Sequence, residues 1–363
     1  MGRLSSFGQH LYTGKVSFDF VGRRMLWYAI SAVLVLGSAA GLGVHGLERG
    51  IDFKGGVEFT AQVAKADSAA VDSLSEAVVD TGLDAAAAPV ANTSGDATVR
   101  IQTGTLTQDE TTQVIDALES AGATEVSQNL VGPSWGAEVA KKALTGLLVF
   151  LVIVVLFIWA YFREWRMSVA AMVALAHDIV ITVGVYAWSG FEVTPATVTG
   201  LLTILGYSLY DTVVVFDKVR ENTRGITAST TRIYSEQANL AVNQTLVRSI
   251  NTSITALLPV GALLIVGVGV LGSGPLKDLA LALFVGMAVG TYSSIFIATP
   301  LAAQLKERDP AIREHTAKVL QRRAKGVEKV GAPAPAVARP VATSAAAGRR
   351  QPQRSSRQQR RGR

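Results

Sequence analysis

Six separate runs of apolar residues constrain what this chain can fold into. Each is about 20 residues long, the length that spans the hydrocarbon core of a bilayer as an α-helix. The runs are Met25–Val44, Ala143–Tyr161, Met167–Trp188, Thr197–Phe216, Ile250–Val270 and Leu279–Leu301. Hydrophobic residues make up 49% of the 363 positions and charged residues only 17%, too apolar a composition for an ordinary soluble domain. The sequence therefore predicts a polytopic membrane protein with six transmembrane helices.

Basic and acidic residues fall in different segments, which predicts an orientation. Segment 46–135 carries 4 Lys and Arg against 14 Asp and Glu, whereas positions 306–363 carry 16 against 4. Loops rich in Lys and Arg stay in the cytoplasm. We therefore expect a cytoplasmic tail 1–24, a first span 25–44 and an extracytoplasmic domain 46–135. Spans two to six are expected within 143–301, with a cytoplasmic loop 217–249. The basic tail 306–363 is expected in the cytoplasm and is predicted to be disordered from about residue 331.

Segment 46–135 has the pattern of a small α+β domain. Thr107, with Glu110 three residues later, forms a capping box that predicts a helix start, and Gly122 predicts the end of that helix. The other expected elements are strand Val57–Val63, helix Ala69–Thr81, strands Ala87–Asn92 and Ala97–Thr103, and strand Thr124–Val131. This β-α-β-β-α-β order is the ferredoxin-like motif.

Two aspartates interrupt the apolar spans, Asp178 in the third and Asp211 in the fourth. An unpaired charge at such a place costs roughly 3 kcal/mol on insertion scales, so intramembrane carboxylates usually carry function. Polar or small residues accompany them at helical spacing: Thr182, Tyr186 and Ser189 on the third span, Gly200, Thr203 and Tyr207 on the fourth, and Thr245, Arg248, Thr252 and Thr255 on the fifth. These stripes predict a hydrated or hydrogen-bonded seam suited to proton passage, with a static polar core as the alternative.

The seam suggests how a proton could be carried. A desolvated carboxylate takes up a proton more readily, and an approaching guanidinium opposes this. Asp211 lies near the cytoplasmic end of the fourth span and Arg248 near the start of the fifth, so we expect the two at similar depth. Asp211, Arg248, Asp178 and Thr252 are the candidate proton-pathway residues. His177 is expected on a different helix face from Asp178.

Other signals concern packing and exclude several kinds of site. Gly55-Gly56 predicts a turn with positive φ at the membrane exit, and no Walker A sequence is present. The absence of cysteine excludes disulfides and thiolate chemistry, and no His/Asp/Glu cluster has metal-ligand spacing. We therefore expect no cofactor and no metal. Small residues recur every four positions in the last span and predict a close-packing face: Ala282, Gly286, Gly290, Ser294, Ala298 and Ala302.

Four motifs together resemble the SecD/SecF family of protein-export membrane proteins, and within it the SecF type. The first follows span one and contains Gly50, Asp52, Phe53, Gly55 and Gly56; the second, in span three, is Ala174-Leu175-Ala176-His177-Asp178. The third contains Gly206, Tyr207, Ser208, Asp211, Thr212, Asp217 and Arg220, and the fourth begins span five at Asn243-Gln244-Thr245 and includes Arg248 and Thr252. The likeness covers residues 15–305.

This resemblance implies a transport subunit of the resistance–nodulation–division type and not an enzyme. It implies a bacterial plasma-membrane protein that partners a SecD-like six-span subunit and the SecYEG channel, and uses the proton motive force to drive late translocation and release of preprotein substrates. Asp211 and Arg248 match the family's proton-path positions, while Tyr210 stands where many members have Asn. No specific nucleic-acid partner is implied.

Two other classes remain as alternatives. A proton-coupled exporter of small molecules or lipids, from the same superfamily, would share the aspartates but usually carries twelve spans in one chain. An intramembrane aspartyl protease would need a Gly-x-Gly-Asp motif, and Asp178 is preceded by Ala176-His177 instead.

Overall fold

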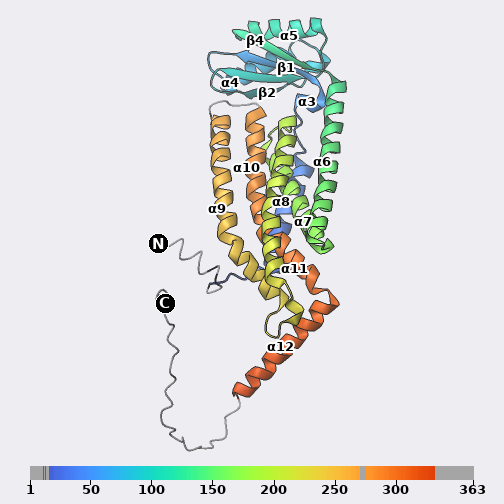
Figure 1. Ribbon diagram of the computed structural model, residues 1–363. Coiled ribbons are helices and arrows are strands. Elements are labelled where there is room, and N and C mark those ends of the chain that lie inside the picture. The colour runs from blue at the N-terminus through green and yellow to red at the C-terminus, as the bar shows by residue number, and fades with distance from the viewer. Residues whose placement is uncertain (1–10, 12, 14–15, 270–274, 332–363) are drawn as a thin grey trace, which may run out of the picture. The chain divides into compact units, whose positions relative to one another are not determined.

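The computed structural model describes residues 11, 13, 16–269 and 275–331. Within these residues, six helices are long and apolar enough to cross a membrane, which confirms the prediction (Figure 1). They are α2 (Arg24–Val44), α6 (Pro133–Phe162), α7 (Trp165–Ser189), α8 (Pro195–Thr223), α9 (Tyr234–Gly269) and α10 (Pro275–Ser293), the last continuing through the π-helical turn η3 (Ser294–Ala298) into α11 (Thr299–Glu307). The amphipathic helix α12 (Pro310–Gly331) follows. The predicted disordered tail lies beyond residue 331 and thus outside the described residues.

The segment expected to be the cytoplasmic loop 217–249 is mostly helical, because α8 ends later and α9 begins earlier than their apolar runs. Between them lies only a short connection with one 3₁₀ turn, η2 (Ile226–Ala228). The first turns of α9 hold the N-terminal segment: Asn239 Oδ1 accepts hydrogen bonds from the backbone of Phe20 and Val21, and Asn243 Oδ1 accepts one from Phe18. The polar part of α9 is therefore held by contacts with a distant segment. A prediction based on apolar runs alone does not detect such contacts.

The domain between α2 and α6 has the predicted ferredoxin-like order. Its elements are α3 (Ile51–Lys54), β1 (Gly56–Gln62), α4 (Ser68–Val79), η1 (Asp84–Ala86), β2 (Val90–Thr93), β3 (Thr98–Thr103), α5 (Gln108–Ser120) and β4 (Glu125–Val131). The four strands are antiparallel in the order β2-β3-β1-β4. The capping box of Thr107 and Glu110 is present. A buried core joins one sheet face to α4 and α5 through Phe59, Ile101, Leu74 and Leu118.

Polar contacts connect this domain to the loop between α7 and α8. Val193 N–H donates to the Glu48 carbonyl at 2.7 Å, and Gly50 N–H donates to the Val193 carbonyl at 3.0 Å. On the sheet, Gln102 Nε2 donates to both carboxylate oxygens of Glu192 at 3.0 Å. Gly50 thus pairs directly with the loop between α7 and α8.

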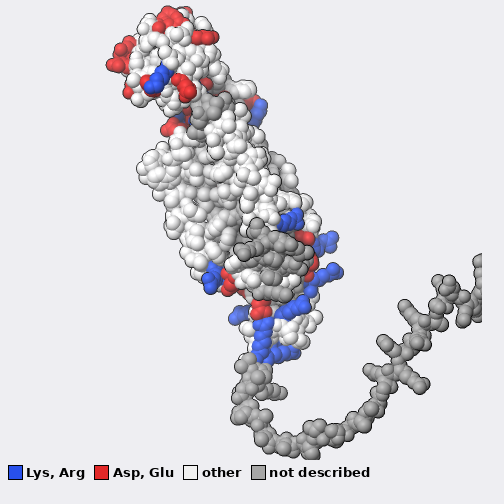
Figure 2. Space-filling model, turned by 90° about the vertical axis from the view of Figure 1, so that its left-hand side faces the viewer, with Lys and Arg blue, Asp and Glu red and all other residues white. Residues whose placement is uncertain are grey.

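Charge is segregated over the surface. On the face drawn in Figure 2, mostly acidic atoms lie over the α+β domain, and a belt over the helices is almost without charged atoms. A belt of this kind is what the hydrocarbon region of a bilayer requires.

Candidate functional site

Glycines in α10 bring it close enough to α8 to build a site between them. A Cβ atom on Gly290 would lie 2.8 Å from Cβ of Ser208, and one on Gly286 would overlap the Ile204 side chain. The small-residue face predicted for the last span therefore packs on α8, as in small-xxx-small contacts. This approach places serines of the last span beside the two intramembrane carboxylates.

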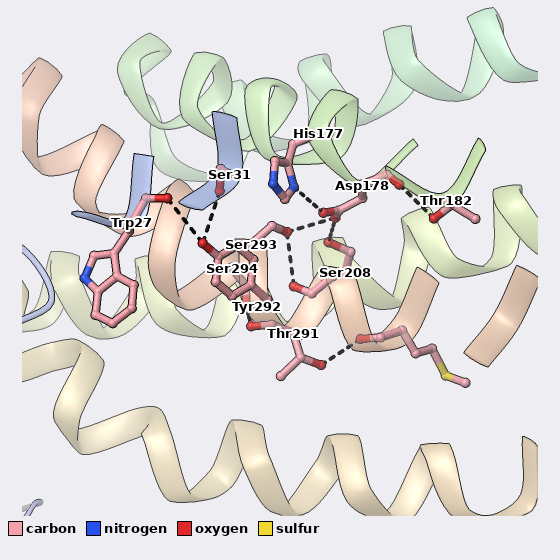
Figure 3. Close-up of polar contacts among 12 residues, drawn as sticks. Trp27, Ser31, His177, Asp178, Thr182, Ser208, Thr291, Tyr292, Ser293 and Ser294 are labelled. Atoms are coloured by element: carbon pink, nitrogen blue, oxygen red, sulfur yellow. Dashed lines mark hydrogen bonds and ion pairs between the residues drawn. The ribbon is translucent and has the colours of Figure 1, made fainter. Parts of the chain in front are cut away.

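Asp178 on α7 is 1% exposed and is held by hydroxyl groups from two other helices. Its Oδ2 accepts hydrogen bonds from Ser208 Oγ of α8 at 2.6 Å and from Ser293 Oγ of α10 at 2.9 Å (Figure 3). Its Oδ1 lies 3.2 Å from Nδ1 of His177. Hydrogen bonds to a charged group are stronger than those between neutral groups, so these donors offset part of the cost of burying the carboxylate.

Asp211 on α8 is 6% exposed and has the same kind of environment. Its Oδ1 accepts from Ser249 Oγ of α9 at 2.6 Å, and its Oδ2 accepts from Ser294 Oγ at the start of η3. Both serines are fully buried. The consecutive residues Ser293 and Ser294 therefore serve the two carboxylates, one each.

Arg248 does not pair with Asp211 in this conformation. Its Nη2 donates to Tyr210 Oη at 2.9 Å, and its guanidinium lies 6.0 Å from the centre of the Tyr210 ring. The expectation was that the two residues lie at similar depth; in this conformation the partner of Arg248 is Tyr210. The reason is helical geometry: Asp211 faces inward toward η3, whereas Tyr210, one position earlier, is 56% exposed. Tyr210 thus supplies the acceptor for Arg248.

The expectation that His177 points away from Asp178 is wrong. Although the two are consecutive, the imidazole bends over the carboxylate, and the ring also stacks on Tyr292 with 5.9 Å between centroids. Nε2 of His177 is buried without a hydrogen-bond partner among the described residues. Tyr292 Oη in turn lies 3.1 Å from Ser31 Oγ of α2 (Figure 3).

Most other residues of the predicted polar stripes bond within their own helix. Threonine hydroxyls donate to the carbonyl four residues earlier at Thr182, Thr203, Thr245, Thr252 and Thr255. This back-bonding satisfies the hydroxyl without a partner on another helix. The Thr252 hydroxyl therefore donates to its own helix and to neither carboxylate. The contacts between helices come from Tyr207, which donates to Ser253 at 3.3 Å, and from Tyr186, which donates to the Asp278 carbonyl.

The remaining motif residues of α8 are spread over several environments. Gly206 and Asp217 are exposed, Thr212 is buried, and Arg220 Nη1 donates to the Tyr161 carbonyl at 3.3 Å. Of this motif, only Ser208 and Asp211 take part in the carboxylate contacts. Ser249, Ser293 and Ser294 were not predicted as site residues. Ser294 is part of the small-residue face and Ser249 follows Arg248 in the sequence. Neither position by itself predicts a hydrogen bond to a carboxylate.

The motif after α2 has the backbone that was predicted from its two glycines. Gly55 has φ +74° and Gly56 φ +141°, so both lie where L-residues are strained. Asp52 of α3 lies near Glu58 and Glu192; burial chiefly, and then these two carboxylates, raise the pKa of Asp52 above its ordinary value. Across the part of the chain that the structure describes, no group of three or more His, Cys, Asp or Glu residues is placed to hold a metal ion.

Comparisons with known proteins agree on one family. The family model described as "Protein export membrane protein SecD/SecF, C-terminal" matches residues 112–308, and the "SecD/SecF GG Motif" matches residues 40–67. The chain is 49% identical over 338 residues to the protein translocase subunit SecF of Streptomyces coelicolor, covering 91% of this chain and 87% of the relative. It is 47% identical to the SecF subunit of Mycobacterium tuberculosis, covering 88% and 74%.

A solved structure shows the same fold. The crystal structure of SecDF from Thermus thermophilus, described as a translocon-associated membrane protein, superposes with a TM-score of 0.70 at 32% identity. The match covers 81% of this chain and 39% of the SecDF chain, so this chain corresponds to less than half of that longer protein.

Proposed function

The chain belongs to the SecF family of protein translocase subunits, and on that premise we propose that it works with a SecD-type subunit to convert proton flow into late preprotein translocation. Family membership makes it a multi-pass transport component of the bacterial membrane and not an enzyme. Association with a SecD-type chain is supported by relatives in which both are one polypeptide, such as SecDF of Thermus thermophilus. The SecYEG channel and the preprotein as partners belong to the proposal.

The observation that carries the proton-coupled function is the environment of Asp211. The carboxylate is buried in the bundle, accepts from Ser249 and Ser294, and forms no ion pair with any residue that the structure describes. A carboxylate stabilised by neutral donors alone can change its protonation at modest cost, because no buried cation is left unpaired when it is neutralised. We propose a second state in which Arg248 leaves Tyr210 and pairs with Asp211, so that protonation and helix position are linked.

Preprotein release tests this function. Vesicles that hold the chain with its SecD-type partner and an export channel should release a trapped preprotein faster when a proton gradient is imposed. A protonophore should remove the acceleration. Release that is equally fast with and without the gradient would refute proton coupling, whereas release that needs this chain but not Asp211 would place the proton elsewhere.

An exposed polar strip on α8 and α9 supports association with a second membrane subunit. The strip consists of Thr199, Thr203, Tyr210, Arg248, Asn251, Thr252 and Thr255, all exposed. An arginine facing lipid costs about 3 kcal/mol or more, so a protein surface is the better neighbour. By contrast, the exposed face of α6 is apolar, with Leu148, Val152 and Leu156.

A crosslinking pair checks this assignment. A photoreactive residue at Thr255 of the strip should link to the SecD-type subunit, and the same probe at Val152, which is 59% exposed on α6, should label lipid instead. Figure 1 shows α9 and α6 at opposite sides of the bundle, so one partner surface does not reach both. Crosslinks from Val152 but not from Thr255 would place the partner on the other face.

The orientation and the domain boundaries are also proposals. Charge places both termini, the connection between α8 and α9, and the basic tail 306–363 in the cytoplasm, with segment 46–135 outside. The chain has no cysteine, so single cysteines report the side directly. An impermeant thiol reagent applied to intact cells should label Ala97→Cys but not Thr230→Cys, both positions being exposed. Labelling of the second position from outside would reverse the topology.

A further inference from the structure

Two consecutive serines at the start of η3 each have a choice of two acceptors. Ser293 Oγ lies 2.9 Å from Oδ2 of Asp178 and 3.2 Å from the Gly290 carbonyl oxygen. Ser294 Oγ contacts Oδ2 of Asp211 and lies 3.1 Å from the Thr291 carbonyl oxygen. A hydroxyl carries one proton and donates to one strong acceptor at a time. Each serine can therefore donate either to its carboxylate or to the carbonyl three residues earlier.

The second acceptor matters when a carboxylate takes up a proton. A protonated carboxyl becomes a donor, so its O–H needs an acceptor. If the serine hydroxyl still pointed its own proton at the carboxyl, the two O–H groups would face each other and the carboxyl proton would have no acceptor. A buried donor left without a partner costs about as much as a lost hydrogen bond. If the hydroxyl turns to the carbonyl of Gly290 or Thr291, its oxygen is free to accept from the carboxyl, and both the serine O–H and the carboxyl O–H have an acceptor.

We propose that Ser293 and Ser294 are positioning residues that switch acceptor with the protonation state of Asp178 and Asp211, respectively. When the carboxylate is ionised, the serine donates to it; when it is protonated, the serine donates to its own helix and accepts from the carboxyl. The serine keeps its proton throughout, and only the O–H direction changes. This deepens the proposed function and rests on it, because it explains how buried carboxylates cycle protons without leaving an unpaired group.

The local backbone fits such a role. The wider π turn begins at Ser294, and the Ser294 carbonyl accepts from Thr299 Oγ1 at 3.1 Å, five residues on. Turns of this kind are rare and occur often at functional sites. His177 from α7 is the titratable side chain that contacts Asp178, and Tyr292 from α10 stacks on that imidazole. Nearest to Asp211 in the sequence, Tyr210 pairs with Arg248 of α9 on the exposed side of α8. None of these donates to Asp211 in this conformation.

A crossed pair of substitutions tests the proposal. Removing a donor from an ionised carboxylate favours its protonated form. Ser294→Ala should therefore move the protonation midpoint of Asp211 upward by about one pH unit, and Ser293→Ala should do the same for Asp178. Neither should shift the other carboxylate as much. The midpoints are read from the infrared band of the protonated carboxyl, in the full chain with its partner in vesicles, and assigned by loss of each band in Asp178→Asn and Asp211→Asn.

Ser168→Ala is the matched control. Ser168 is buried in α7, but its hydroxyl has no hydrogen-bond partner among the described residues, so its removal should move neither midpoint. Alanine is already present in the small-residue face at Ala298 and Ala302, so Ser294→Ala should pack normally. Unchanged midpoints, or equal shifts of both bands by either serine variant, would overturn the proposal. The infrared band reports protonation of the carboxyl directly. The effect of each serine can therefore be measured even if the chain proves not to drive export with protons.

Discussion

Asp211→Asn is expected to abolish the acceleration of preprotein release by a proton gradient while leaving assembly with the partner intact. Asparagine has nearly the same shape, its Oδ1 can accept from one of the two serines, and its Nδ2 can donate to the other hydroxyl oxygen. The bundle should therefore fold normally. The amide cannot take up and release a proton, so the gradient-dependent part of the rate should fall to the level seen with a protonophore.

Two further variants serve as controls for this result. Asp116→Asn makes the same chemical change at an exposed position of α5 and should leave gradient-dependent release unchanged. Arg248→Met keeps an unbranched, flexible side chain but removes the charge, and should show the defect of Asp211→Asn if the two side chains pair in a second state. Full gradient-dependent release by Asp211→Asn, in a complex that assembles, would leave Asp211 as a structural contact between α8, α9 and η3.

The spans and the α+β domain could be predicted from the sequence because their signals are local. An apolar run as long as Met167–Trp188 has one favourable structure in a bilayer, and a capping box such as Thr107 with Glu110 fixes a helix start by bonds within one turn. The order of helices and strands along the α+β domain also followed from the alternation of segments. The early start of α9 did not, because Asn239 and Asn243 are polar and their partners lie more than 200 residues away.

The carboxylates could be predicted, but their partners could not. An aspartate within an apolar run is conspicuous in the sequence, whereas serine is common in membrane helices and often bonds its own backbone. Which serines reach Asp178 and Asp211 depends on how closely α10 approaches α8, and Gly286 and Gly290 set that distance. Helical spacing singled out Arg248 but could not show that Tyr210 is its acceptor.

Gly56→Ala is expected to unfold the α+β domain or to destabilise it by roughly 3 kcal/mol or more, and the reasons are independent of membrane insertion. Gly56 opens β1 with φ +141°, a region that residues with a Cβ avoid at a cost of about 1–3 kcal/mol. A Cβ there would also overlap the Thr103 carbonyl oxygen, which belongs to the neighbouring strand β3 and cannot move aside without disturbing the β1–β3 pairing. The loss would be measured as the fall in the domain's unfolding temperature within the full chain.

Gly82→Ala separates the two causes. Gly82 has φ +68°, but an added Cβ meets nothing within 4 Å, so this variant adds backbone strain without a clash. It should lower the free energy of unfolding by about 1 kcal/mol, the usual cost when alanine adopts the left-handed conformation. If both variants lower the unfolding temperature equally, backbone conformation alone accounts for the glycine at position 56. A loss at Gly56 that exceeds the roughly 1–3 kcal/mol of backbone strain would show that the close approach of β3 requires glycine at this position.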